Sequence, residues 1–169
     1  MNGDEHEPHQ CGHSRSEGFC FGPLEPDFLA AIPEEHRSTR VLIDSDLCTI
    51  DDRHFFIRGL LGLPILGTTR SFYWLVWVSL SKENFNRAAD LWESPGRENE
   101  PPYFGWLNTR LPSYPDTSEL KVNVHTLDVG KRPMIEVEHS DHPLSHDQFE
   151  GITMERAESL AKQVLLEWA

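Results

Sequence analysis

Basic residues are scarce in this 169-residue chain. Lys and Arg together number 15 against 28 Asp and Glu, which gives a formal net charge of −13. The basic residues are not concentrated in any segment. A nucleic-acid partner is therefore not expected, because binding to a phosphate backbone needs clustered Lys and Arg. An acidic surface is typical of solubility and, less often, of docking on a basic partner.

Cysteines and long apolar runs are also few. The cysteines Cys11, Cys20 and Cys48 are too scattered for a disulfide framework. No apolar run reaches transmembrane length, and no basic-then-apolar signal segment opens the chain. These absences predict a reduced, cytoplasmic protein that does not enter a membrane.

Recognisable catalytic motifs are missing as well. The chain has no phosphate-binding glycine loop, no Gly-x-Ser-x-Gly elbow, no His-Glu-x-x-His pair and no dinucleotide fingerprint. The pair Asp44 and Asp46 has the chemistry to hold a cation, but two carboxylates make a weak signal. We therefore expect no cofactor.

The segment 70–81, RSFYWLVWVSLS, is the most informative stretch that is present. Bulky apolar side chains occur at both alternating sets of positions, with Phe72, Trp74 and Val76 on one and Leu75 and Trp77 on the other. β-Branched and aromatic residues favour strands, and two apolar faces need cover on both sides. The pattern predicts a central strand.

Local signals place the other elements around that strand. Residues 23–32 resemble a short helix, 40–43 and 47–51 resemble strand pieces, and 53–61 a further strand. Ser81 is a helix N-cap candidate before Phe85, Ala88, Ala89 and Trp92, and Thr153 caps the last helix. We predict one α+β domain over residues 22–169, a mostly antiparallel sheet with packed helices.

Residues 1–21 are expected to form a flexible polar leader, because they lack apolar periodicity. Zinc-ligand residue types occur there, including Cys11, His13 and Cys20, but no Cys-x-x-Cys pair does. We predict that the leader is dispensable for folding and that the purified chain carries little zinc.

The segment 101–115 is aromatic and contains four prolines, which prevent a long regular element. Its aromatic residues include Tyr103 and Trp106, and two readings stay open: a lid over the core, or the wall of a pocket.

Residues 120–127 and 133–138 predict a β-hairpin. Val122 and Val124 would face the core, and Lys121 would lie opposite Glu138, a favourable charge pair. The polar face would then collect Asn123, His125 and Glu136, either as a solvated surface or as part of a site.

Several phrases, in this order, carry a family resemblance: IDSDLCTID, FFIRGLLGLPILGT, YWLVWVSLS, PPYFGWLNTRLPSYPDT, KVNVHT and RPMIEVEHSDHPL. From about residue 44 to about residue 153 the chain resembles an uncharacterised bacterial family, domain of unknown function 2199. The resemblance implies bacterial origin and no known activity. Family members often begin with a Cys-x-x-Cys-Gly knuckle, of which this chain has only Cys11-Gly12, with Pro8 three residues earlier.

Two functions compete. The first is a binding module for a protein or small-molecule ligand, with a candidate site at Tyr103, Trp106, Asp116, Asn123, His125 and Glu136. The second is a hydrolytic or metal-dependent enzyme, in which His125 or His139 acts beside Asp116, Glu136 or Asp141. The sequence does not show which of these side chains converge.

Overall fold

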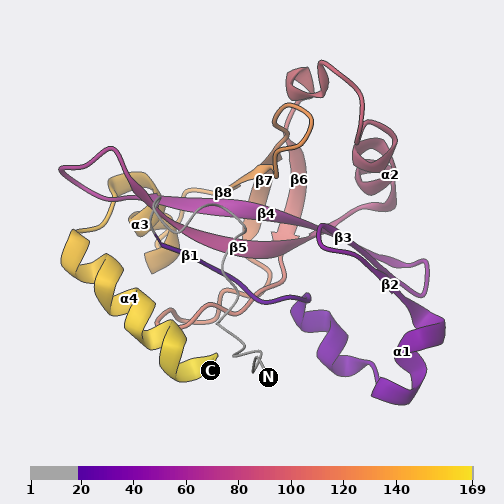
Figure 1. The fold of residues 1–169 in the computed structure, drawn as a ribbon, viewed down its shortest axis with the longest axis horizontal. Helices are drawn as coiled ribbons and strands as arrows, with labels where there is room; N and C mark the ends of the chain where they lie inside the picture. The colour runs from indigo at the N-terminus through magenta and orange to yellow at the C-terminus, as the bar shows by residue number, and fades with distance from the viewer. Residues whose placement is uncertain (1–18, 169) are drawn as a thin grey trace, which may run out of the picture.

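The computed structural model describes residues 19–168, and Figure 1 shows their arrangement. One eight-stranded, mostly antiparallel sheet is combined with four α-helices, so the predicted α+β class is confirmed. The strands are β1 Cys20–Phe21, β2 Val41–Ile43, β3 Leu47–Ile50, β4 His54–Pro64, β5 Ser71–Leu80, β6 Tyr103–Leu107, β7 Lys121–His125 and β8 Met134–Val137. The helices are α1 Glu34–Arg40, α2 Lys82–Asp90, α3 Pro143–Glu150 and α4 Met154–Glu167, with 3₁₀ turns η1 Asp27–Ala31 and η2 Arg97–Asn99.

Strand β5 is central, as predicted. It pairs with β4 and β6 in antiparallel fashion and with β1 in parallel fashion. Phe72, Trp74 and Val76 belong to the main apolar core, whereas Trp77, on the opposite face, belongs to a second core with Phe56. The two apolar faces of the sequence pattern are therefore both covered.

Strands β4 to β8 form a closed ring of pairings. Each is antiparallel to the next, and β8 closes the ring by pairing in parallel with β4, where Met134 lies beside Leu60. Gly59 allows this closure, because a Cβ there would lie 2.6 Å from Ile135 Cδ1 and 2.8 Å from the Pro133 carbonyl oxygen. In Figure 1, β6 and β7 run steeply across β4 and β5.

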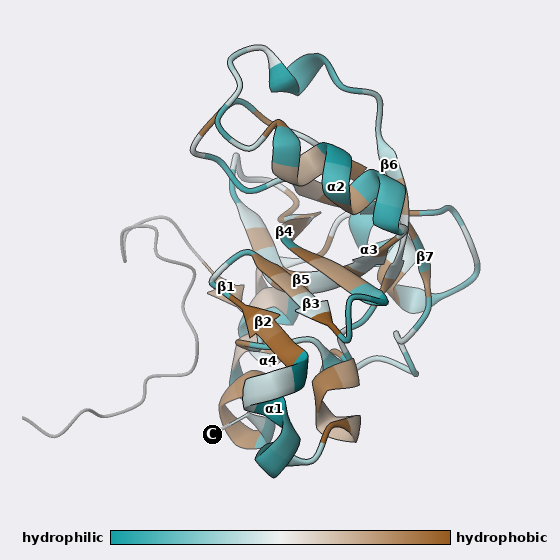
Figure 2. Ribbon diagram, turned by 90° about the vertical axis from the view of Figure 1, so that its right-hand side faces the viewer, coloured by the Kyte–Doolittle hydropathy of each residue, from teal (hydrophilic) through white to brown (hydrophobic). Residues whose placement is uncertain are grey.

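The predicted helix caps are present. The Ser81 hydroxyl accepts a hydrogen bond from the Asn84 amide at the start of α2, and Thr153 does the same for Arg156 in α4. Hydrophilic and more apolar bands alternate along α2 in Figure 2, as expected of an amphipathic helix. Both helices bury apolar side chains in the main core, and η1 adds Leu29 to the second one.

The structure differs from the sequence predictions in three segments. The helix predicted over residues 23–32 is the shorter 3₁₀ turn η1, followed after Pro33 by α1. The proline-rich aromatic segment contains strand β6, because its prolines flank residues 103–107 and do not interrupt them. The segment from Pro143 to Glu150, for which the sequence predicted no element, forms α3, and His142 caps it.

The beginning of the folded region also differs. The predicted leader included residues 19–21, yet Phe19 stacks on Phe72, the Phe21 ring packs against Phe72 at a tilt, and β1 joins the sheet. Cys20 is disulfide-bonded, which differs from the expectation of reduced cysteines, whereas Cys48 is a buried free thiol. The predictions for Cys11 and His13 lie outside the described residues. Within residues 19–168, no helix is long and apolar enough to cross a membrane.

Candidate functional site

The outward side chains of β6, β7 and β8 form a continuous surface, called the outer face below. Because side chains alternate along a strand, inward residues such as Val122, Val124 and Ile135 are buried in the core. The opposite set points away from the core, and its members are exposed or partly exposed. They are Phe104, Trp106, Lys121, Asn123, His125, Met134 and Glu136.

The strand register arranges this face in rows. Phe104 lies opposite Asn123, which in turn lies opposite Glu136, so one row crosses all three strands. Trp106 lies opposite Lys121, and His125 lies opposite Met134. The hairpin register predicted from the sequence is confirmed. Of the predicted site residues, Trp106, Asn123, His125 and Glu136 share the outer face.

Two aromatic rings dominate one side of the outer face. Phe104 and Trp106 are each 42% exposed, and their rings meet edge to face with centroids 5.3 Å apart. The Lys121 ammonium lies 5.9 Å from the centre of the Trp106 ring. Large apolar side chains at a solvent surface typically mark a binding surface when they are contiguous. Phe104 was not among the predicted site residues, although it alternates with the buried Tyr103.

One polar atom of the outer face, His125 Nε2, has unfilled hydrogen-bonding capacity. His125 Nε2 is 3.7 Å from Glu136 Oε1, which is too long for a hydrogen bond. This nitrogen has no hydrogen-bond partner among the described residues, although it is shielded from solvent. The His125 ring nitrogen thus keeps unused hydrogen-bonding capacity next to a carboxylate.

Tyr103 lies on the inward side and is buried. Its hydroxyl donates to Glu100 Oε2 at 2.7 Å, and Arg87 binds the same carboxylate through two nitrogens at 2.9 and 2.8 Å. Burial and the Glu100 carboxylate raise the pKa of Tyr103 to about 12. Hydrogen bonds from Arg87 and Tyr103 lower the pKa of Glu100 to about 2. Tyr103 therefore links β6 to Glu100 and, through it, to Arg87 of α2.

Asp116 lies in the loop between β6 and β7. Its carboxylate accepts a hydrogen bond from the Ser118 amide, which lowers the pKa of Asp116, and Arg110 Nε is 3.9 Å away. The main-chain carbonyl of Asp116 contacts His142 Nε2 at 3.1 Å. These contacts tie Asp116 to its own loop and to the start of α3, not to the outer face.

The remaining residues of the enzyme hypothesis, which all lie in the described part of the chain, form no hydrogen bond or ion pair with His125 or Glu136. His139 stacks on Phe149 with ring centroids 3.6 Å apart, and Asp141 is exposed in the turn before α3. Only His125 and Glu136 converge. A histidine and one carboxylate supply a candidate base and its orienting group, but not the nucleophile and oxyanion donors that a hydrolytic site also needs.

A metal centre is not evident in the part of the chain that the structure describes. No group of three or more His, Cys, Asp or Glu side chains within residues 19–168 is placed to hold a metal ion. The carboxylate of Asp44 accepts from the amides of Asp46 and Leu47, and Asp46 pairs with Arg132. The acidic pair considered as a cation site is thus engaged in turn formation and ion pairing.

Comparison with known families identifies the chain's relatives. The model of a family described as uncharacterized protein conserved in bacteria (DUF2199) matches residues 8–152, most of the chain. The chain belongs to the DUF2199 family. No curated protein matches it, and neither does any solved structure. The family resemblance in the sequence is confirmed, and the description of the family names no activity.

Proposed function

We propose that this DUF2199 protein is a non-enzymatic binding module that docks on a basic surface of another protein through the outer face. The observation that carries the proposal is the exposed pair of Phe104 and Trp106, on the same face of the strands as the unsatisfied His125 nitrogen. The proposed site thus keeps Trp106, Asn123, His125 and Glu136, adds Phe104, and leaves out Tyr103 and Asp116.

A protein partner suits the shape and composition of this face. Aromatic residues, Trp above all, anchor protein interfaces because they bury a large area at a low entropic cost. Phe104 and Trp106 stand on one paired strand, so the backbone that carries them is already ordered. Asn123 and Glu136 lie in the next strands along the same row and supply hydrogen-bonding groups that orient a partner.

Charge supports a basic partner. The chain carries a formal net charge of −13, which accelerates encounter with positive surfaces. Glu136 lies on the outer face itself, and the Trp106 ring already has a lysine ammonium near it. Arg or Lys side chains of a partner would find the same cation–π chemistry. The proposed location is the cytoplasm; the unpaired thiol of Cys48 supports it, whereas the disulfide at Cys20 argues the other way.

Comparative affinity capture tests the proposal. The wild-type chain, the variant Phe104→Ser/Trp106→Ser and the control Leu166→Ser are each immobilised and exposed to a bacterial lysate at low salt. Leu166 is 79% exposed on α4, so the control also removes an exposed apolar side chain, but from another element. We expect a basic protein retained by the wild type and the control and lost from the double variant.

Affinity for the purified partner then measures the effect. Loss of an interface Trp anchor typically costs at least about 2 kcal/mol, or about 30-fold in Kd. The control should stay within about twofold of the wild type, and the wild-type affinity should fall as salt rises. If no captured protein depends on the two aromatic residues, the proposal is wrong.

The second candidate is a hydrolytic enzyme, and one observation favours it: His125 Nε2 and Glu136 Oε1 lie 3.7 Å apart. Such a pair has the chemistry of a general base with an orienting carboxylate. A panel of ester, amide and phosphoester substrates, assayed with wild type and with His125→Ala, tests it. Turnover that the variant loses while it melts like the wild type would favour the enzyme.

A further inference from the structure

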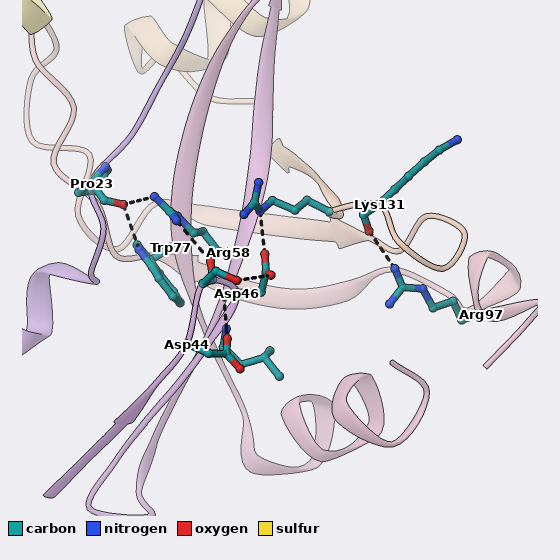
Figure 3. A network of polar contacts seen from close by, with 10 residues as sticks. Pro23, Asp44, Asp46, Arg58, Trp77, Arg97 and Lys131 are labelled. Atoms are coloured by element: carbon teal, nitrogen blue, oxygen red, sulfur yellow. Dashed lines mark hydrogen bonds and ion pairs between the residues drawn. The ribbon is translucent and has the colours of Figure 1, made fainter. Parts of the chain in front are cut away.

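Arg58 is an unusual residue in the interior of this fold. It belongs to β4, between apolar neighbours, and is only 5% exposed. Its terminal nitrogens donate to two main-chain carbonyls, that of Ser45 at 3.3 Å and that of Pro23 at 2.6 Å. Figure 3 shows the bond between Arg58 and Pro23. Its guanidinium carbon lies 5.5 Å from the centre of the Trp77 ring.

No carboxylate of the described residues forms an ion pair with Arg58. A guanidinium has five N–H groups, and the two hydrogen bonds to Pro23 and Ser45 leave three without a partner among the described residues. The covered Nε atom is one of these. A buried charge is ordinarily paired, because its desolvation is costly. The Arg58 guanidinium is therefore buried without a paired anion in the described part of the chain.

A second arginine lies near this one. Arg132 Nε donates to Asp46 Oδ1 at 2.7 Å, and both side chains are 23% exposed, so this side of the cluster is open to solvent. The Arg58 amide donates to the Asp46 carbonyl, which fixes β4 beside the Asp46 turn. Burial and repulsion from Arg132 lower the pKa of Arg58 to about 10, while Asp46 acts in the opposite direction. The Asp46 carboxylate lies near both guanidinium groups but pairs with Arg132 and not with Arg58.

The acidic groups around the cluster cannot easily supply a second counter-charge. One carboxylate oxygen of Asp44 accepts from two main-chain amides, those of Asp46 and Leu47, and this holds the turn. The second oxygen of Asp46 accepts from the Ser45 hydroxyl. The cluster of Arg58, Arg132 and Asp46 therefore keeps an excess of one positive charge in a strongly acidic chain.

We propose that Arg58 and Arg132 form a binding site for an oxyanion group, a carboxylate or a phosphate, and that Asp46 is its internal competitor. An incoming anion meets the partly exposed Arg132 first and displaces the Asp46 carboxylate from it. The anion then accepts from N–H groups of Arg58 that have no other partner. Planar guanidinium groups bind such anions through two parallel hydrogen bonds, which gives the site its selectivity over chloride. The site is separate from the outer face and does not depend on its function.

Titration with inorganic phosphate and, separately, with acetate tests the site, with chloride at equal ionic strength as the reference. Binding is followed by two-dimensional NMR of main-chain amides and arginine Nε–H groups. We expect saturable shifts at Arg58 Nε–H, Arg132 Nε–H and the amides of residues 45–47. The anion that saturates at the lower concentration identifies the preferred group.

Three variants make the test specific. Arg132→Gln should weaken the anion affinity at least about tenfold, because a charge-assisted hydrogen bond is lost. Asp46→Asn should strengthen it several-fold, since the competitor no longer carries charge. Arg110→Gln, an exposed arginine elsewhere, should leave it unchanged. These variants avoid the buried Arg58, whose replacement risks unfolding the chain. Absence of saturable binding, or binding indifferent to Arg132→Gln and Asp46→Asn, overturns the proposal.

Discussion

Replacing Arg97 should show how the hairpin that carries the outer face is held in place. Arg97 is 5% exposed, and its guanidinium donates to four main-chain carbonyls, those of Trp92, Leu127, Asp128 and Lys131. Three of these belong to the segment that joins β7 to β8. The Arg97 side chain therefore forms hydrogen bonds with three main-chain carbonyls of this turn from the interior of the fold.

The expected magnitude follows from these contacts. A hydrogen bond to a charged group contributes roughly 1.5–3 kcal/mol, and an unsatisfied buried group costs about 1–3 kcal/mol. The four bonds are not additive, because water reaches some of the carbonyls once the side chain is gone. The Trp92 ring, 5.2 Å from the Arg97 guanidinium carbon, adds a cation–π contribution. We expect Arg97→Ala to lower the free energy of unfolding by about 3–5 kcal/mol.

Urea denaturation followed by tryptophan fluorescence measures this loss. Arg97→Lys should fall between Ala and wild type, since an ammonium group keeps the charge but lacks the planar fork that reaches four acceptors. Arg110→Ala is the control; its exposed side chain should change stability by no more than about 0.5 kcal/mol. A loss below about 1 kcal/mol for Arg97→Ala would show that the turn does not depend on this side chain.

Three further predictions use the same denaturation assay. Trp74→Ala should lower the free energy of unfolding by about 3–5 kcal/mol and Trp106→Ala by about 1–2 kcal/mol, because the first side chain is fully buried and the second is 42% exposed. Equal losses of stability would place Trp106 in the core. Gly59→Ala should cost about 1–3 kcal/mol, since its Cβ would meet Ile135 where β8 closes on β4, and an unchanged midpoint would contradict this. Hydrogen bonds from Arg87 and Tyr103 lower the pKa of Glu100 from 4.5 to about 2, so the stability that they contribute is present above pH 4.5 and lost as the pH falls toward 2. Arg87→Ala should flatten the pH dependence of the unfolding free energy in that window. An unaltered pH profile would refute the assignment.

The elements that could be predicted are those with a local cause. Alternating bulky residues over 70–81 predicted the central strand, and hydroxyl side chains at Ser81 and Thr153 predicted two helix starts. The hairpin register followed from placing valines inward and opposite charges across the strands, which also predicted that Asn123 faces Glu136. These signals act between neighbours in sequence or between adjacent strands, so tertiary context changes them little.

The elements that were missed, β6 and α3, stand beside prolines that favoured a loop in the sequence. Proline density concealed β6, although the five residues from Tyr103 to Leu107 contain no proline and alternate inward and outward. Pro143 concealed α3, even though proline suits the first helical position, and His142 is an unusual cap that accepts from the Leu144 amide through Nδ1.

The candidate site was predictable only in part, for the same reason. Asn123, His125 and Glu136 followed from the hairpin, but the position of Phe104 beside Trp106 required β6 to be recognised as a strand. The buried arginines left no signal, because Arg58 and Arg97 bind main-chain carbonyls of distant segments. Carbonyls belong to every residue type, so no sequence pattern marks such a partner.

Photo-cross-linking in growing bacteria tests the central claim, that the outer face binds a protein. Trp106 is replaced by p-benzoylphenylalanine, and the control carries the same residue in place of Leu166, which is exposed on α4. We expect a discrete cross-linked product with a basic protein at position 106 and none at position 166. Discrete products at position 166 alone, or none at position 106, would contradict the assignment of the outer face as the binding surface.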